Sequence, residues 1–212
     1  RGGHLYISCD PLFLEILRKK VEPAFHRLHP ELTLVFTEQD QAQTLEALGN
    51  SSADLGVFLS TARAHPLLKC DVLALTEMVY CFAPAHRPAG WQPGGPLPQD
   101  FTPQPQLLSA QGSTLRREQD LLFANVFSAS PVAACEAAPS ILRQLADLGI
   151  ADSILPLNLV DRSQHYRCAA FDPPKPLYLL LGTHVGRALP SVTKELAQLI
   201  RSALTDALEL PQ

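Results

Sequence analysis

Apolar and polar positions alternate along the first third of the chain in a way that predicts strands separated by helices. Four short runs rich in apolar and β-branched residues are typical of strands: residues 4–8, 32–36, 54–59 and 73–82. Between them, residues 11–28 and 41–48 carry apolar side chains every three or four positions, which predicts one buried helix face in each. Strands that alternate with helices favour an α/β fold with largely parallel sheets.

The same alternation returns in the second half of the chain. Strands are predicted at residues 107–109, 132–135, 154–160, 166–171 and 177–181. Helices are predicted from about residue 114 to 127, at 139–148 and at 191–208. The run at 177–181 is almost entirely apolar, as expected for a strand buried on both faces.

Prolines mark the ends and interruptions of these elements. Asp10 is a good helix cap, and Pro11 suits the first helical position. Pro23 interrupts the first helix and predicts a kink or a restart there, because proline cannot donate the backbone hydrogen bond. Seven of the 19 prolines fall between residues 84 and 105, which predicts a surface connection between two folded parts.

Composition narrows the class of protein. Apolar residues make up 46% of the 212 and charged residues 18%, which excludes an intrinsically disordered chain. The net charge of −4 makes this segment by itself a poor nucleic-acid binder. No apolar run is long enough for a membrane helix, and no signal peptide opens the chain. Because the first residue is Arg1, we expect a fragment or a processed product.

The five cysteines favour reduced thiols in a cytoplasm over a metal site or a disulfide framework. Their number is odd and none forms a C-x-x-C motif: Cys9, Cys70, Cys81, Cys135 and Cys168. The histidines form no H-E-x-x-H pattern, and no G-x-S-x-G, Walker or G-x-G-x-x-G motif is present. We therefore expect no catalytic residues, no metal and no cofactor.

Three loops that follow predicted strands are candidates for ligand binding, because ligands of open α/β sheets bind beyond the carboxyl ends of the strands. They are residues 8–10, residues 111–114 and residues 136–140. An ordinary capping role explains Asp10, Ser113 or Thr114, and Ser140, taken one at a time. Cys9 lies in the first loop, where a helix N-terminus can lower the pKa of a thiol, but a buried structural cysteine is the commoner case.

Several short motifs occur in an order that resembles the effector-binding domain of LysR-type transcriptional regulators. They are Gly3–Ser8, Phe25-x-x-x-His29-Pro30-Glu31-Leu32-Thr33-Leu34, Leu45-x-x-Leu48-Gly49, Asp54-Leu55-Gly56-Val57, Gly112-Ser113-x-x-Arg116, Leu148-Gly149-Ile150-x-x-x-Ile154-Leu155-Pro156 and the closing strand at 177–182 with its helix. Each motif is weak alone, and the inference depends on their order and spacing over nearly the whole chain.

The resemblance implies a two-lobed, type 2 periplasmic-binding-protein-like fold, with two Rossmann-like α/β subdomains joined by two crossover strands. Lobe I would comprise residues 1–104 and 170–212, and lobe II residues 105–169. The family's N-terminal winged helix-turn-helix would be absent from this chain. A small effector would bind between the lobes and change the pairing of domains in a homodimer or homotetramer. DNA would be bound only through the missing domain, and the protein would be cytoplasmic, without contact to a membrane.

The resemblance also implies which residues contact the effector: Ser8, Cys9, Asp10, Ser60, Thr61, Gly112, Ser113, Thr114 and Glu136. Ser113 and Thr114, with the amides of their helix, would hold an anionic group. Asp10 and Glu136 would face an amine or hydroxyls, so the expected effector is an anionic or zwitterionic metabolite. Thiol-sensing members use a cysteine pair, but Cys135 and Cys168 are 33 residues apart, and we do not transfer that chemistry.

Two other functions remain open at this stage. The same fold occurs in periplasmic solute-binding proteins of transporters, although the free cysteines and the short chain argue against this class. It also occurs in enzymes such as a dehydratase of amino-acid biosynthesis, against which the lack of a catalytic motif argues. The sequence identifies neither the effector nor the genes controlled.

Overall fold

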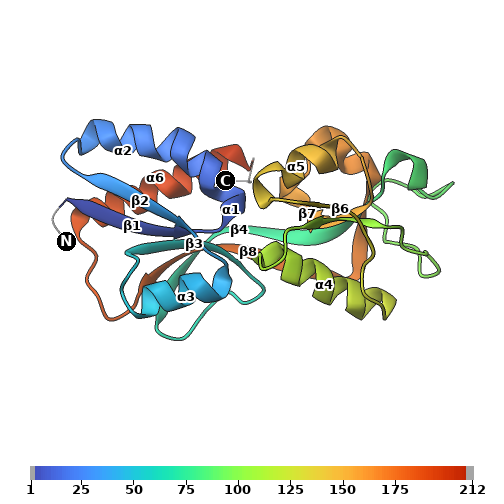
Figure 1. Cartoon of the computed structure of the whole chain (residues 1–212), viewed down its shortest axis with the longest axis horizontal. Coiled ribbons are helices and arrows are strands. Elements are labelled where there is room, and N and C mark those ends of the chain that lie inside the picture. The colour runs from blue at the N-terminus through green and yellow to red at the C-terminus, as the bar shows by residue number, and fades with distance from the viewer. Residues whose placement is uncertain (1–2, 209–212) are drawn as a thin grey trace. The chain divides into compact units, whose positions relative to one another are not determined.

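The computed structural model describes residues 3–208, which form two compact units (Figure 1). Among these residues, unit 1 comprises 3–75 and 178–208, and unit 2 comprises 76–177. Two long strands continue from one unit into the other: β4 (Leu68–Cys81) and β8 (Cys168–His184). The predicted α/β fold is confirmed, but strand pairing is mixed rather than largely parallel.

Unit 1 is built on a sheet whose strand order is β2-β1-β3-β8. Its first three strands are β1 (His4–Cys9), β2 (Thr33–Glu38) and β3 (Leu55–Ser60). β1 pairs in parallel with both β2 and β3, whereas β3 pairs antiparallel with β8, from Gly56 opposite Gly182 to Ser60 opposite Tyr178. The carboxyl ends of β1, β2 and β3 therefore lie at one edge of the sheet.

The helices of unit 1 follow the predicted pattern. α3 (Gln41–Gly49) and α6 (Ser191–Ala207) match the expected ranges within a residue. The predicted interruption of the first helix is also confirmed. α1 (Pro11–Ile16) runs into a π-helical segment (Leu17–Val21) and then α2 (Glu22–Leu28). Pro23 has no N–H for an ordinary helical bond, and the wider π turn lies immediately before it.

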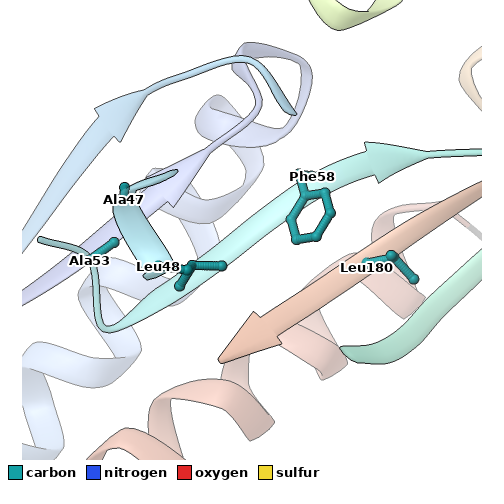
Figure 2. Packing of buried hydrophobic residues seen from close by; sticks show 5 residues of the cluster. All are labelled: Ala47, Leu48, Ala53, Phe58 and Leu180. Atoms are coloured by element: carbon teal, nitrogen blue, oxygen red, sulfur yellow. The ribbon is translucent and has the colours of Figure 1, made fainter. Parts of the chain in front are cut away.

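One part of the core of unit 1 lies where α3 packs against the sheet (Figure 2). Leu48 of α3, Phe58 of β3 and Leu180 of β8 are each at most 1% exposed. Ala47 and Ala53 complete the cluster. This packing fixes α3 beside the strand ends, and the polar residues of α3 named below depend on that position.

Unit 2 contains the second half of β4, the first part of β8 and two small pairs of strands. β5 (Gln106–Ser109) pairs in parallel with β6 (Ala133–Ala137), and β4 pairs antiparallel with β7 (Ser153–Pro156). Two helices follow β5 and β6 in the chain: α4 (Thr114–Phe127) and α5 (Pro139–Asp147). Three short 3-10 segments complete the unit: Pro84–His86, Leu157–Leu159 and Arg162–Arg167. β7 is shorter than the predicted strand at 154–160, because the chain turns into the second of these segments after Pro156.

The proline-rich stretch at 84–105 is a surface segment of unit 2, and it does not mark the boundary between the units. Trp91 is 9% exposed and its ring lies 5.2 Å from that of Phe82, measured between centroids. Phe101 packs 5.1 Å from Tyr80, and the N–H of Leu97 donates to the carbonyl of Ala170 at 2.7 Å. Because these contacts hold the stretch to unit 2, the units change at 75/76 and 177/178, whereas the prediction placed the changes at 104/105 and 169/170.

The two strands predicted at 166–171 and 177–181 form the single strand β8. The residues between them include Pro173, Pro174 and Pro176, and proline is typical of loops because it lacks a donor. In β8 the segment from Asp172 to Pro174 is exposed. An exposed strand segment tolerates proline, since no neighbouring strand requires its N–H.

Candidate functional site

In unit 1, the loops that follow β1 and β2 are each tied to a neighbouring strand by a backbone hydrogen bond. The N–H of Asp10 donates to the carbonyl of Val57 at 2.8 Å, and the N–H of Gln39 donates to the carbonyl of Cys9 at 3.0 Å. The side chains at this edge form what we call the unit 1 cluster: Ser8, Asp10, Gln39, Gln41, Thr44, Ser60 and His65. The edge is the place where a parallel sheet offers a ligand site.

Ser8 is buried and its hydroxyl is occupied within the protein. It donates to Oε1 of Gln39 at 2.6 Å and lies 2.7 Å from Oγ1 of Thr44. The side chain is 1% exposed. These bonds give Ser8 a structural role that joins β1 to the loop after β2 and to α3.

Asp10 is the one carboxyl group in the unit 1 cluster, and it is 3% exposed. Its Oδ1 accepts the N–H of Leu12 at 3.0 Å, so the predicted cap of α1 is confirmed. Burial raises the pKa of Asp10 to about 7, the charge of Asp40 acts in the same direction, and the Leu12 bond opposes both. Near neutral pH this group can therefore hold or release a proton.

Cys9 is fully buried, and its thiol donates to the carbonyl of Asp10 at 3.2 Å. Burial raises the pKa of Cys9, and the charges of Asp10 and Glu38 raise it further. A buried thiol with a raised pKa is a poor nucleophile, so the structural interpretation of Cys9 is favoured over the reactive one.

Ser60 joins the third loop to α3. Its Oγ accepts the N–H of Ala62 at 3.0 Å and the Nε2 of Gln41 at 3.2 Å, and lies 2.9 Å from Nε2 of His65. Burial lowers the pKa of His65, which favours the neutral imidazole. Thr61, in contrast, is exposed.

In unit 2, the predicted loop at 111–114 connects β5 to α4. Gly112 has a positive φ of +83°, and no atom lies within 4 Å of the position that a Cβ would occupy. Ser113 caps α4, since its Oγ accepts the N–H of Arg116 at 3.0 Å. The same oxygen donates to the carbonyl of Ala110 at 2.9 Å and lies 2.9 Å from Oγ of Ser109. The capping role of Ser113 is confirmed, and Thr114 follows as a buried residue. The predicted cap at Ser140 is wrong, because α5 begins at Pro139 after Ala138 and Ser140 lies within the helix.

Arg116 connects this loop to Glu136. It is 8% exposed, and its NH1 donates to Oε1 of Glu136 at 3.0 Å and to the carbonyl of Ser109 at 3.1 Å. Its Nε donates to both carboxylate oxygens of Asp120, at 2.9 and 3.1 Å. Glu136 lies in β6 with its side chain 45% exposed. We call Ser109, Ser113, Arg116, Gln119, Asp120 and Glu136 the unit 2 cluster.

Several of these residues were not predicted as candidates. They are Gln39, Gln41, Thr44 and His65 in unit 1, and Ser109, Gln119 and Asp120 in unit 2. Gln119 accepts the N–H of Ser109 at 2.8 Å and donates to the carbonyl of Ile154 at 2.9 Å. Gln39 and Gln41 could have been found only from their position in the sequence, because they follow a predicted strand and lie at the start of a predicted helix. Arg116 was noted only as part of a motif.

The structure therefore brings the predicted residues together in two sets, one in each unit. Ser8 and Ser60 each bond a side chain of α3, Asp10 lies beside Ser8 in the chain and caps α1, and Gly112, Ser113 and Glu136 adjoin Arg116. Within residues 3–208, no three His, Cys, Asp or Glu side chains lie close enough together to hold a metal ion. In the same part of the chain, no helix has the length and apolar character needed to cross a membrane.

Comparison with known proteins agrees with this architecture. Residues 1–205 match the family model described as the LysR substrate binding domain. Comparison with curated proteins gives no match.

Among solved structures, an OxyR mutant from Porphyromonas gingivalis is similar with a TM-score of 0.68 and 18% identity, covering 99% of this chain and 98% of that one. The effector binding domain of QuiR in complex with shikimate has a TM-score of 0.64 and 19% identity, over 95% and 97%. The regulatory domain of Synechocystis CcmR in complex with 2-PG has a TM-score of 0.67 and 15% identity, over 94% and 96%. At these identities the likeness shows the fold, which is the predicted type 2 periplasmic-binding-protein-like fold.

Proposed function

This chain belongs to the family of LysR substrate-binding domains, and from that premise we propose that it senses a small-molecule effector for a LysR-type transcriptional regulator. The regulator binds DNA through a separate helix-turn-helix domain, which agrees with the net charge of −4 of this chain. It works in the cytoplasm as a homodimer or homotetramer. The domain acts by binding and catalyses no reaction. The family assignment favours this function over a transporter's solute receptor or an enzyme.

We propose that the effector carries an anionic group that binds at the start of α4. The first N–H groups of a helix have no partners within the helix and carry partial positive charge. At α4 they follow Gly112, whose missing side chain leaves open space beside the backbone. This open, capped start of a 14-residue helix is the observation that carries the proposal.

Arg116 supports the same assignment, and its partners explain why a zwitterion fits better than a simple anion. The guanidinium lies one helical turn into α4 and adds positive charge to the loop, but Asp120 and Glu136 balance that charge. The half-exposed carboxylate of Glu136 can accept hydrogen bonds from an amine or a hydroxyl.

Titration calorimetry with two variants of one residue tests the anion site. Shikimate and 2-PG, which the two similar domains bind, serve as first probes beside a panel of small carboxylates and amino acids. In Ser113→Asp the new carboxylate still caps α4 but repels an anion, so affinity should fall at least about tenfold without loss of stability. In Ser113→Ala the affinity should fall less, with a loss of stability of about 1 kcal/mol.

Ser130→Ala is the matched control, because Ser130 is an exposed serine beyond the other end of α4. Its affinity should equal that of the unmodified protein. If Ser113→Asp binds every ligand as tightly as the control does, the anion does not bind at α4. Sedimentation of the unmodified protein tests whether it forms a homodimer or homotetramer. A single species with the mass of the monomer would exclude both.

A further inference from the structure

The structure places two cysteines of unit 2 side by side, although 87 residues separate them in the sequence. The Sγ atoms of Cys81 and Cys168 are 3.2 Å apart. Cys81 ends β4 and Cys168 begins β8. Both side chains are buried, with 1% and 5% of their surfaces exposed. No sequence motif pairs these two cysteines, and the effector proposal uses neither of them.

A cavity of about 370 Å³ leads to one of the two thiols. Its walls include Glu77 and Val79 of β4, Cys168 and Ala170 of β8, and the side chains of His165 and Tyr166. Alternate residues of a strand lie on one face, so Cys81 shares a face with Glu77 and Val79. Cys81 itself does not line the cavity. Of the two cysteines, Cys168 is therefore the one that a small molecule in the cavity can contact, and the sulfur of Cys81 lies 3.2 Å from that of Cys168.

From this arrangement we propose that Cys81 and Cys168 form an oxidisable dithiol, in which Cys168 reacts with a small hydroperoxide and Cys81 then closes a disulfide. This site is separate from the effector site and does not depend on the proposed function. Its substrate class is a hydroperoxide small enough for the cavity, such as hydrogen peroxide or a short alkyl hydroperoxide.

The electrostatics of the pair agree with this division of roles. The hydrogen bond from Cys81 lowers the pKa of Cys168, and the nearby Arg167 acts in the same direction. The same bond and burial raise the pKa of Cys81. Although burial opposes it, this shift makes Cys168 the more readily ionised thiol of the pair, and when Cys168 is a thiolate Cys81 is the donor between the two sulfurs. Thiolate character and access both determine which cysteine reacts with peroxides, and both favour Cys168.

The reaction balances with the hydroperoxide as the only oxidant. The Cys168 thiolate attacks one peroxide oxygen, an S–O bond forms, the O–O bond breaks, and the released alkoxide or hydroxide takes a proton from solvent. The Cys81 sulfur then attacks the sulfenic acid of Cys168, an S–S bond forms, and the sulfenic oxygen leaves as water with the remaining thiol proton. The dithiol loses two electrons and the peroxide gains them.

The backbone already suits the disulfide. The N–H of Phe82 donates to the carbonyl of Arg167 at 2.9 Å, which holds the residues next to the two cysteines together. The sulfur atoms need to approach by only about 1 Å to reach the covalent length of about 2.05 Å. The bond would tie β4 to β8, the two strands that continue into unit 1.

Hydrogen peroxide added to the reduced protein tests the proposal. We would use the variant Cys70→Ser/Cys135→Ser, which removes the two partly exposed thiols and leaves Cys9, Cys81 and Cys168. After alkylation and proteolysis, mass spectrometry should find one disulfide-linked peptide pair that joins Cys81 to Cys168, and Cys9 should be alkylated only after unfolding. The oxidised protein should unfold at a temperature several degrees higher, because the bond closes a long loop.

Two further variants in the same background separate the roles. In Cys81→Ala, peroxide should leave a sulfenic acid on Cys168 that dimedone traps. In Cys168→Ala, Cys81 should react with peroxide at least about tenfold more slowly. The proposal is overturned if Cys81 and Cys168 are both recovered as free thiols from folded protein under conditions that oxidise the same variant in urea. It is overturned equally if Cys81 reacts as fast without Cys168.

Discussion

The two candidate clusters occupy the same kind of place in their units, since each lies at the carboxyl ends of parallel strands, but their chemistry differs. The unit 1 cluster is a network of neutral hydroxyl and amide groups around one buried carboxyl, that of Asp10. The unit 2 cluster is built around a buried guanidinium with two carboxylate partners. The topology of the sheet therefore determines where a ligand can bind. The side chains at that position determine which ligand charge the site accepts and how the site depends on pH.

The largest expected difference between the clusters is their dependence on pH. Asp10 titrates near pH 7 in the folded protein and near 3.8 in the unfolded chain. Between these pH values the folded protein binds more protons than the unfolded chain. The protonated Asp10 carboxyl therefore contributes its full stabilisation below pH 4, and this stabilisation is lost as the pH rises through 7. The difference corresponds to at most about 4 kcal/mol in the free energy of unfolding.

Asp10→Asn should abolish this dependence, because an asparagine keeps the cap of α1 but has no proton to release. Hydrogen exchange in peptides of β1 and β3, followed from pH 5 to pH 8, measures the stability of unit 1. The control Asp206→Asn removes an exposed carboxylate of α6 and should keep the unmodified pH profile. An unchanged profile in Asp10→Asn would mean that Asp10 does not titrate in this range.

The next largest change in stability should come from removing the charge of Arg116, at the centre of the unit 2 cluster. Arg116→Met leaves Asp120 and Glu136 without their partner and removes a donor to the carbonyl of Ser109. We expect a loss of about 2 to 3 kcal/mol, less than for a fully buried pair because both carboxylates are partly exposed. Urea unfolding followed by the fluorescence of Trp91, the single tryptophan, reports on unit 2.

Arg117→Met provides the matched control, since Arg117 is the adjacent residue of α4 and is exposed. Its unfolding curve should shift by no more than about 0.5 kcal/mol. Equal losses in the two variants would mean that Arg116 stabilises unit 2 by its helical position alone, and the contrast between a charged and a neutral cluster would fail.

A smaller effect is expected from the neutral network of unit 1. Ser60→Ala removes a hydroxyl that bonds Gln41, Ala62 and His65, which should cost about 1 to 2 kcal/mol. The neighbouring Thr61→Ala changes an exposed side chain and should cost at most about 0.5 kcal/mol. Hydrogen exchange in α3 peptides measures both variants, and a Thr61 effect as large as that of Ser60 would contradict the network.

Sequence reasoning succeeded where the cause is local. The cap formed by Asp10, the start of α4 at Ser113 and the interruption near Pro23 follow from residues within one helical turn, and all three are present. The element types also followed, because apolar spacing reports directly on which face is buried.

Sequence reasoning failed where a residue's position depends on a partner that is distant in the sequence. The partners of Ser8 are 31 and 36 residues away, Glu136 is 20 residues from Arg116, and Cys81 is 87 residues from Cys168. None of these distances has a signature in one sequence. The place of the proline-rich stretch in unit 2 depends on the packing of Trp91 on Phe82, which local composition does not show.

The smallest predicted changes in the free energy of unfolding come from replacing one glycine beside each cluster by alanine, and the two changes should have opposite signs. A Cβ on Gly49, the last residue of α3, or on Gly112, before α4, would meet no atom within 4 Å, so neither substitution to alanine is opposed by a clash. Only Gly112 has a left-handed φ, at +83°. Gly112→Ala should therefore cost about 1 kcal/mol, whereas Gly49→Ala should stabilise by about 0.5 to 1 kcal/mol through the lower entropy of the unfolded chain. Trp91 fluorescence and α3 hydrogen exchange measure the two, and a stabilising Gly112→Ala would show that the loop before α4 adopts an ordinary backbone conformation.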